Sequence, residues 1–333
     1  MEINFSASLL IFLLSAAVVI VSGILLAKSG DAIAEHSGLG RVWVGSLLVA
    51  GATSLPELVT VVSAVLLDSP SLALGTIFGA NMINMAKFSI LVLIFGGSNI
   101  FKNLLKLQVW VATFAFSLTF VGVLMIVFSN HIKIFGVSPF GILLIILYFL
   151  TSKFLYQNSF SDSSEGNIKE HDSQNTSIKK HWILFFISAA MIFIAAPLLT
   201  YSSEKISEFS NISQSFIGVL GLGFVASLPE FTAAAAAFKI GAPDLGVSAL
   251  FGSNSFNIAA LGVADIFYTN GSLFSSSDTS HLLAGIFATI LIGLCLVQLY
   301  QKREMNIYSF KTPSPLIVIL IYILGIFVVF NSG

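Results

Sequence analysis

Ten long apolar stretches run through the sequence and decide what the chain can fold into. A helix needs about 20 apolar residues to cross the hydrocarbon core of a bilayer. Only 9% of the 333 residues are charged and 56% are hydrophobic, whereas a soluble domain has about 25% charged residues. We therefore expect an all-α membrane protein and not a soluble one. Its ten transmembrane helices are predicted at residues 4–27, 38–66, 71–95, 106–129, 132–155, 181–202, 212–238, 244–268, 280–301 and 312–332.

One long polar segment, residues 157–180, separates the first five stretches from the last five. It is rich in Ser, Asp, Glu, Asn and Lys, which predicts a flexible linker. The predicted organisation is a first membrane half at 1–156, the linker at 157–180 and a second membrane half at 181–333.

The basic residues predict how the chain lies in the bilayer. Of the 15 Lys and Arg residues, twelve fall in loops or at span ends on the linker side of the membrane, and Lys133 and Lys205 fall on the other side. Cytoplasmic loops carry an excess of basic residues, so we expect a cytoplasmic linker and both termini outside. The chain would be a multi-pass protein of the plasma (inner) membrane. The net charge of −1 gives no reason to expect a nucleic-acid partner.

The two halves share a repeated motif. Ser54-Leu55-Pro56-Glu57 recurs as Ser227-Leu228-Pro229-Glu230, an offset of 173 residues (230 minus 57), and no gap is needed from residue 45 to residue 84. Each half has five predicted spans, an odd number, so the second half must enter the membrane from the opposite side. Transporters with such inverted repeats bind their substrate near the midplane, where broken helices meet.

A proline followed by a carboxylate lies deep in the second and the seventh predicted spans. Pro56 and Pro229 lack an N–H, so a carbonyl four residues earlier loses its partner. In lipid that carbonyl must be satisfied by protein, water or a ligand. An isolated proline would suggest only a helix kink, but here Glu57 and Glu230 follow directly.

The two glutamates predict a cation site. A charged side chain at the bilayer centre costs about 3 kcal/mol, and such residues usually mark ion or proton pathways. Two carboxylates brought together by the repeat repel each other unless a cation or a proton lies between them. A divalent cation with oxygen ligands would resolve that repulsion. The alternative is a pair of protonated glutamates with a structural role.

The other candidate ligands also carry oxygen. They lie near the two glutamates in the sequence or at helical spacing in the third and eighth spans. For the asparagines, hydrogen bonding between helices is the alternative role. The absence of nearby His and Cys argues against zinc, copper and iron, so the set suits calcium or sodium. These candidates are Thr53, Ser54, Ser227, Ser253, Asn81, Asn84, Asn254 and Asn257. Gly75, Gly79 and Gly252 predict close helix packing instead.

The motifs ATSLPELVT with FGANMIN and VASLPEFTA with FGSNSFN resemble the two alpha-repeats of the sodium/calcium exchanger family, in the calcium:cation antiporter superfamily. The resemblance implies an antiporter and not an enzyme, with no cofactor. It would exchange transported Ca²⁺ for a monovalent counter-ion, Na⁺ or H⁺, by alternating access, as the first and sixth spans slide past the rest. It also implies that Glu57 and Glu230 hold calcium together with the backbone carbonyls of Thr53 and Ala226. The hydroxyls and amides around them would help to bind sodium.

Three positions depart from the family pattern. The common Thr is Ala226, the common Ser is Ala80, and the Asp often found in the second repeat is Asn257. Sodium coupling is therefore in doubt, and both sodium and protons stay open as counter-ions.

Lys87 is the one basic residue that lies well inside a predicted span, more than five residues from either end. It lies three residues after Asn84, where an unpaired ammonium would be costly. Either its side chain snorkels to the membrane interface, or it pairs with Glu57 or Glu230 and stands in for a bound cation.

Other functions remain as alternatives. An exchanger of other cations would use the same site. A channel would need a continuous polar stripe or a filter loop, and neither is visible. A scaffold or receptor that has lost transport would keep the helices without moving an ion. The sequence does not specify the oligomeric state.

Overall fold

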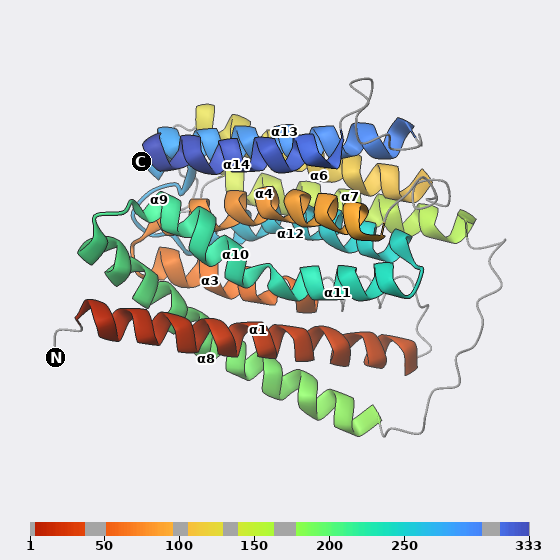
Figure 1. Cartoon of the computed structure of the whole chain (residues 1–333), viewed down its shortest axis with the longest axis horizontal. Helices are drawn as coiled ribbons and strands as arrows, with labels where there is room; N and C mark the ends of the chain where they lie inside the picture. The colour runs from red at the N-terminus through yellow and green to blue at the C-terminus, as the bar shows by residue number, and fades with distance from the viewer. Residues whose placement is uncertain are drawn as a thin grey trace.

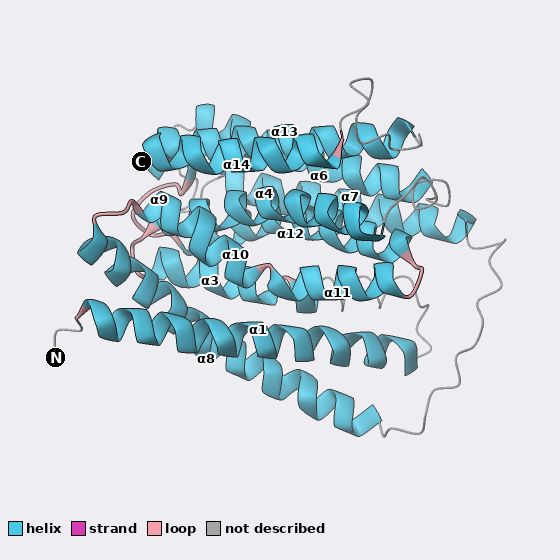
Figure 2. Cartoon of the chain, viewed as in Figure 1, coloured by secondary structure: helices cyan, strands magenta, loops and turns pink. Residues whose placement is uncertain are grey.

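The computed structural model describes residues 4–36, 51–95, 106–128, 139–162, 178–301 and 314–332. Within these ranges the chain is helical and contains no strand (Figure 2). The all-α class predicted from the apolar stretches is therefore confirmed.

Among the described residues, eight helices are long and apolar enough to cross a membrane. A ninth span is broken: a run from α9 (Gln214–Phe216) through the π-helix η2 (Ile217–Leu222) and α10 (Gly223–Ala226) bends by 45° into α11 (Leu228–Lys239). The eight helices are α1 (Phe5–His36), α4 (Pro70–Phe95), α6 (Lys106–Val127), α7 (Pro139–Asp162), α8 (Ile178–Ser210), α12 (Pro243–Phe267), α13 (Thr279–Gln301) and α14 (Pro315–Ser332).

The span predicted at 38–66 is described only from Gly51 onward. Residues 51–53 are helical, Ser54 is a turn, and α3 (Leu55–Leu66) follows. Residues 38–50 lie outside the described part of the chain. The nine spans in the described residues, together with this half-described tenth, are consistent with the predicted ten.

The repeat extends to the bounds of the helices. Adding 173 to the first and last residues of α3 gives those of α11, Leu228 and Lys239. The same offset carries the first residues of α1, α4 and α6 onto those of α8, α12 and α13. The correspondence thus reaches well beyond residues 45–84.

The helices on either side of the predicted linker extend into its two ends. Helix α7 continues to Asp162, and α8 begins at Ile178. Residues 157–162 and 178–180 are therefore helical, and the segment 163–177 lies outside the described residues.

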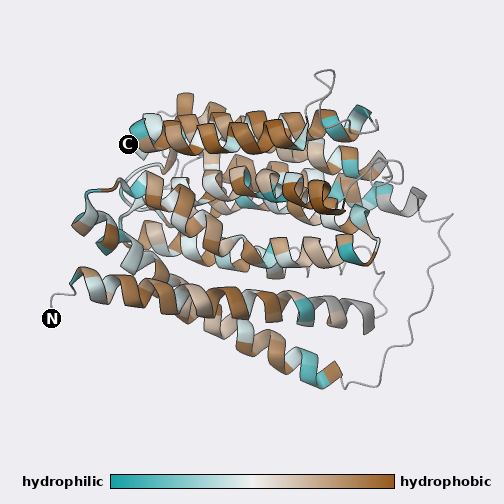
Figure 3. Cartoon of the chain, viewed as in Figure 1, coloured by the Kyte–Doolittle hydropathy of each residue, from teal (hydrophilic) through white to brown (hydrophobic). Residues whose placement is uncertain are grey.

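The outside of the bundle is apolar, and the interior combines an apolar core with many buried polar side chains. The long helices are largely apolar along their length (Figure 3). Large side chains such as Leu14 of α1, Ile194 of α8 and Phe327 of α14 are exposed, as suits helices that face lipid. Buried serines, asparagines and glutamates lie inside, so the polar interior is where a function is to be sought.

Helices α4 and α12 occupy the middle of the bundle and contact each other. Around them, α4 packs against η2, α13 and α14, and α12 packs against α6, α7 and α11. Helices α1 and α8 run together along one side (Figure 1). Helix α1 reaches both proline breaks: a Cβ added to Gly23 would lie 2.3 Å from Pro229 Cγ and 3.4 Å from Pro56 Cγ.

The predicted close packing at glycines holds for one repeat and fails for the other. A Cβ on Gly75 would lie 2.5 Å from the Ser215 carbonyl oxygen, and one on Gly79 would lie 2.3 Å from that of Val219. Helix α4 thus touches the backbone of the α9–η2 segment. Nothing lies within 4 Å of a Cβ on Gly252, so for this residue the prediction is wrong.

Candidate cation site

Two helix breaks place the two glutamates at the centre of the bundle. Ser54 (φ −95°, ψ 6°) and Ser227 (φ −87°, ψ 9°) leave the helical region, and a new helix then begins with Leu-Pro-Glu. Proline suits this position because the first turn of a helix has no use for its missing N–H. Glu57 and Glu230 lie in the first turns of α3 and α11, where the positive end of the helix dipole favours a negative charge.

Both glutamates are fully buried and under-bonded. Their side chains are 0% exposed, and the two carboxyl groups lie close enough to share a hydrogen bond when one of them is protonated. Both carboxyl oxygens of Glu57 and Oε2 of Glu230 have no hydrogen-bond partner. Buried charges in proteins are normally paired or coordinate metals, so three free carboxyl oxygens indicate a site that is completed by a cation or by protons.

Three hydroxyl and carboxyl groups meet on one side of the site. Ser54 Oγ donates to Glu230 Oε1 at 3.1 Å, and Ser253 Oγ donates to the same oxygen at 3.3 Å. The two serine oxygens are 3.2 Å apart. Ser54 from the first repeat thus supports the glutamate of the second.

The four asparagines pair across the crossing of α4 and α12. Asn84 Nδ2 donates to Asn254 Oδ1 at 3.0 Å, and Asn257 Nδ2 donates to Asn81 Oδ1, also at 3.0 Å. The 173-residue offset maps the first bond onto the second. The amides therefore hold the helices together, which was the alternative role considered for them. Asn84 and Asn257 nevertheless keep a carbonyl oxygen without a partner, so each can still serve as a ligand.

The side chain of Lys87 is buried inside the bundle. Its side chain is 3% exposed, and its ammonium donates to the backbone oxygen and to the hydroxyl of Ser227, both at 2.6 Å. This buried position does not fit snorkelling, one of the two alternatives for this residue. Among the described residues the hydrogen-bond partners of the ammonium are these two oxygens of Ser227, and its interaction with Glu230 and Glu57 is one of charge.

The remaining predicted residues lie at the same two breaks. Thr53 and Ala226 are buried at the ends of the helical segments that precede them, and Pro56 and Pro229 are buried just after. The predicted set thus comes together in one region, from the two breaks and the middles of α4 and α12. In the described part of the chain no three His, Cys, Asp or Glu side chains form a metal-binding group. A metal here would need neutral oxygens besides the two carboxylates.

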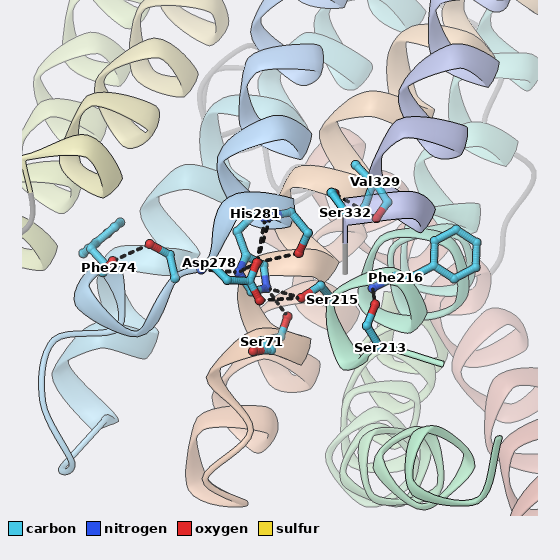
Figure 4. Close-up of polar contacts among 11 residues, drawn as sticks. Ser71, Ser213, Ser215, Phe216, Phe274, Asp278, His281, Val329 and Ser332 are labelled. Atoms are coloured by element: carbon cyan, nitrogen blue, oxygen red, sulfur yellow. Dashed lines mark hydrogen bonds and ion pairs between the residues drawn. The ribbon is translucent and has the colours of Figure 1, made fainter. Parts of the chain in front are cut away.

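A second polar cluster was not predicted. His281 Nε2 lies 2.8 Å from Ser215 Oγ and 3.1 Å from the Ser71 carbonyl oxygen, and Asp278 Oδ1 lies 2.9 Å from His281 Nδ1 (Figure 4). Ser215 and His281 are buried, and the cluster ties together the starts of α4, α9 and α13. Asp278 directly precedes an apolar run, which is a signal for a helix N-cap. This signal could have predicted the Asp278 part of the cluster from the sequence.

The environment of Asp278 favours its charged form. Partial burial raises the pKa of Asp278, but hydrogen bonds and charge interaction with His281, together with a hydrogen bond from Ser280, outweigh burial and hold the pKa well below its ordinary value. The carboxylate also accepts from the backbone N–H groups of Ser280 and His281. It therefore caps the first turn of α13.

Known proteins resemble this chain in sequence and in fold. The chain is 26% identical over 274 residues to an uncharacterized membrane protein of Methanocaldococcus jannaschii, covering 82% of this chain and 83% of the relative. It is 24% identical over 297 residues to the sodium/calcium exchanger MaX1 of Methanosarcina acetivorans, covering 79% and 84%. The crystal structure of an H⁺/Ca²⁺ exchanger, CAX, superposes with a TM-score of 0.72 at 13% identity, covering 97% and 85%.

The family comparison covers both halves of the chain. The model of the family described as "Sodium/calcium exchanger protein" matches residues 7–156 and 180–332 and leaves only the segment between the halves and the ends unmatched. The resemblance suggested by the two Pro-Glu motifs is confirmed: the chain is a multi-pass membrane protein that belongs to the sodium/calcium exchanger family.

Proposed function

We propose that this protein is a secondary active antiporter that moves calcium across a membrane in exchange for sodium or protons. Calcium would bind between Glu57 and Glu230, and the protein would expose that site alternately to the two sides. The three unpartnered carboxyl oxygens in a fully buried, polar centre carry this proposal. Calcium takes six to eight oxygen ligands, and carboxylates are the strongest that this site can offer.

The two helix breaks support the rest of the ligand set. Carbonyls at a break are not all used by the helix, and in transporters such carbonyls coordinate cations. We infer that the carbonyls of Thr53 and Ala226 join the glutamates, with Ser54, Ser227, Ser253, Asn84 and Asn257 around them. Asn81 and Asn254 complete the set at the crossing of the central helices.

The distribution of the basic residues supports a membrane topology. We propose a plasma (inner) membrane protein whose halves, 1–156 and 181–333, have opposite orientations, with the 157–180 linker in the cytoplasm and both termini outside. The linker-side excess of basic residues supports it.

The counter-ion is the open choice within this function. The family comprises exchangers, one relative is named for sodium, and one structural neighbour is named for protons. The departures at Ala226, Ala80 and Asn257 remove groups that the family uses for sodium, and they favour protons.

A flux experiment tests the function and separates the two counter-ions. Vesicles that contain the purified protein and radioactive calcium are placed first in a sodium gradient and then, separately, in a pH gradient. We expect calcium to move with at least one gradient. Glu57→Gln and Glu230→Gln should each reduce that movement at least about tenfold, because changing even an indirect support of a metal site costs 10–100-fold in affinity.

Glu208→Gln provides the matched control. This glutamate is exposed on α8 and pairs with Lys205, so its neutralisation should leave calcium movement unchanged. If Glu57→Gln and Glu230→Gln transport as well as the unmodified protein, the carboxylates do not carry the ion and the proposal is wrong. Calcium movement that depends on neither the sodium gradient nor the pH gradient would indicate a channel.

A further inference from the structure

The Lys87 ammonium lies among groups that typically bind a cation. Its ammonium lies 2.6 Å from the Ser227 carbonyl oxygen, at the break between α10 and α11, and 2.6 Å from the Ser227 hydroxyl oxygen. The rings of Phe224 and Phe231 lie with their centroids 5.8 and 5.9 Å from Nζ. A carbonyl at a helix break, a hydroxyl and two aromatic rings are the groups that attract a monovalent cation.

The repeat shows that this arrangement exists in one half only. Adding 173 to Lys87 gives Ala260, which is 1% exposed and carries no charge. At the first break, Ser54 instead donates to Glu230 and lies near Ser253. The two breaks therefore have similar backbones but different occupants.

The two breaks also differ in the residue before the serine, and this difference supports the same conclusion. The first break has the hydroxyl of Thr53, and the second has Ala226 at the equivalent position. The break that has lost a hydroxyl ligand is the one that the ammonium contacts. The lysine thus lies where a mobile cation would have the fewest protein ligands.

We propose that the Lys87 ammonium is a tethered cation that permanently fills the monovalent position at the Ser227 break. This inference rests on the proposed function and specifies its coupling. With both glutamates ionised and Lys87 charged, the three groups sum to one negative charge. One monovalent ion then neutralises the site, whereas two would be needed without the lysine. Among the proposed ligands, Ser227 would then contact the ammonium and not a mobile ion, and the mobile ions would bind on the Glu57 and Ser54 side.

The number of counter-ions exchanged per calcium tests this inference. In vesicles with a fixed calcium gradient, the counter-ion gradient that just stops net calcium flux gives that number. We expect it to rise by one in Lys87→Met compared with the unmodified protein, for whichever counter-ion drives exchange. Lys239→Met is the matched control, because this lysine is exposed at the end of α11, and it should leave the number unchanged.

A binding measurement covers the case in which Lys87→Met does not transport. In detergent, sodium should raise the melting temperature of Lys87→Met and of Lys87→Gln in a concentration-dependent way, because a ligand that binds only the folded protein stabilises it. The unmodified protein should show a smaller rise at the same sodium concentration. An equal rise in all three proteins overturns the inference.

Different results would contradict the antiporter proposal and the tethered-cation proposal. If the unmodified protein exchanges calcium and Lys87→Met uses the same number of counter-ions, the tethered-cation inference is wrong and the antiporter stands. If the unmodified protein moves no calcium with either gradient, the antiporter proposal is wrong, and the sodium-dependent melting temperatures still decide whether Lys87 fills a cation position.

Discussion

The asparagine pairs show, at the scale of residues, how far a motif specifies its own contacts. The sequence singles out Asn81, Asn84, Asn254 and Asn257 by spacing and repeat. It does not reveal that they bond in two equivalent pairs, because that depends on how closely α4 and α12 cross. The pairs are nearly but not fully symmetric. Asn81 Nδ2 also donates to Thr119 Oγ1 at 3.2 Å, whereas the equivalent of Thr119 is Ile292, which has no acceptor.

The symmetry of the pairs leads to a prediction about stability. Asn84→Ala and Asn257→Ala each delete one amide donor and leave one buried carbonyl oxygen unpaired. Such a loss costs about 1–3 kcal/mol. We expect the two variants to lower the melting temperature of the calcium-free protein by equal amounts. Thermal unfolding in detergent without calcium measures it.

Asn331→Ala is the control for this experiment. Its amide is exposed and donates only to the Phe327 carbonyl oxygen in α14, so its loss should change the melting temperature little. A large effect of Asn84→Ala beside none for Asn257→Ala would contradict the equivalence of the two bonds.

The breaks and the packing of α4 against η2 matter at the scale of elements. The breaks were predictable because each depends on one local residue, Pro56 or Pro229. The π-helix at 217–222 was not predicted, although its neighbour Gly79 was expected to permit close packing. Its position depends on contacts across the bundle: a Cβ on Gly223 would lie 2.8 Å from the Ala80 backbone nitrogen. Such a contact between distant segments cannot be predicted from the local sequence.

Gly79→Ala and Gly252→Ala form a matched pair that tests this packing. At Gly79 a Cβ would meet the Val219 backbone at 2.3–2.7 Å, so η2 must shift, and overpacking of this kind costs about 1–3 kcal/mol. At Gly252, the equivalent position of the second repeat, there is open space. Alanine in mid-helix is better than glycine by about 0.5–1 kcal/mol, so this variant should be slightly stabilised.

Melting temperatures of the two glycine variants decide the matter. We expect a lower value for Gly79→Ala and an equal or higher value for Gly252→Ala. If both variants have the same melting temperature, α4 does not pack tightly against η2. The inferred difference in packing between Gly79 and Gly252 would then be wrong.

At the scale of the whole molecule, composition and the repeat were enough to predict the all-α fold and the gathering of the site residues. Ten apolar stretches leave few alternatives in lipid, where every backbone group must be satisfied internally. What the sequence could not supply were contacts between distant segments. The approach of Lys87 to Ser227, 140 residues away, and of His281 to Ser215 both depend on which helix faces lie against each other.

Membrane topology is the prediction that belongs to the molecule as a whole. The only cysteine, Cys295, is 0% exposed, and reactivity towards a labelling reagent requires exposure. The native chain should therefore label weakly, and single introduced cysteines can report their side of the membrane. Ser173→Cys places a thiol in the predicted linker, outside the described residues. Ser332→Cys places one at the exposed end of α14.

Five predicted spans lie between these two positions, so they must lie on opposite sides of the membrane. A membrane-impermeant maleimide added to intact cells should label Ser332→Cys and spare Ser173→Cys, and inverted vesicles should give the reverse result. The reverse pattern in intact cells would keep the ten spans and exchange inside for outside. Labelling of both positions from one side would require an even number of spans in the second half. If both halves had the same even number of spans, the two repeats would be parallel, and Glu57 and Glu230 would then no longer be related by an axis in the membrane plane.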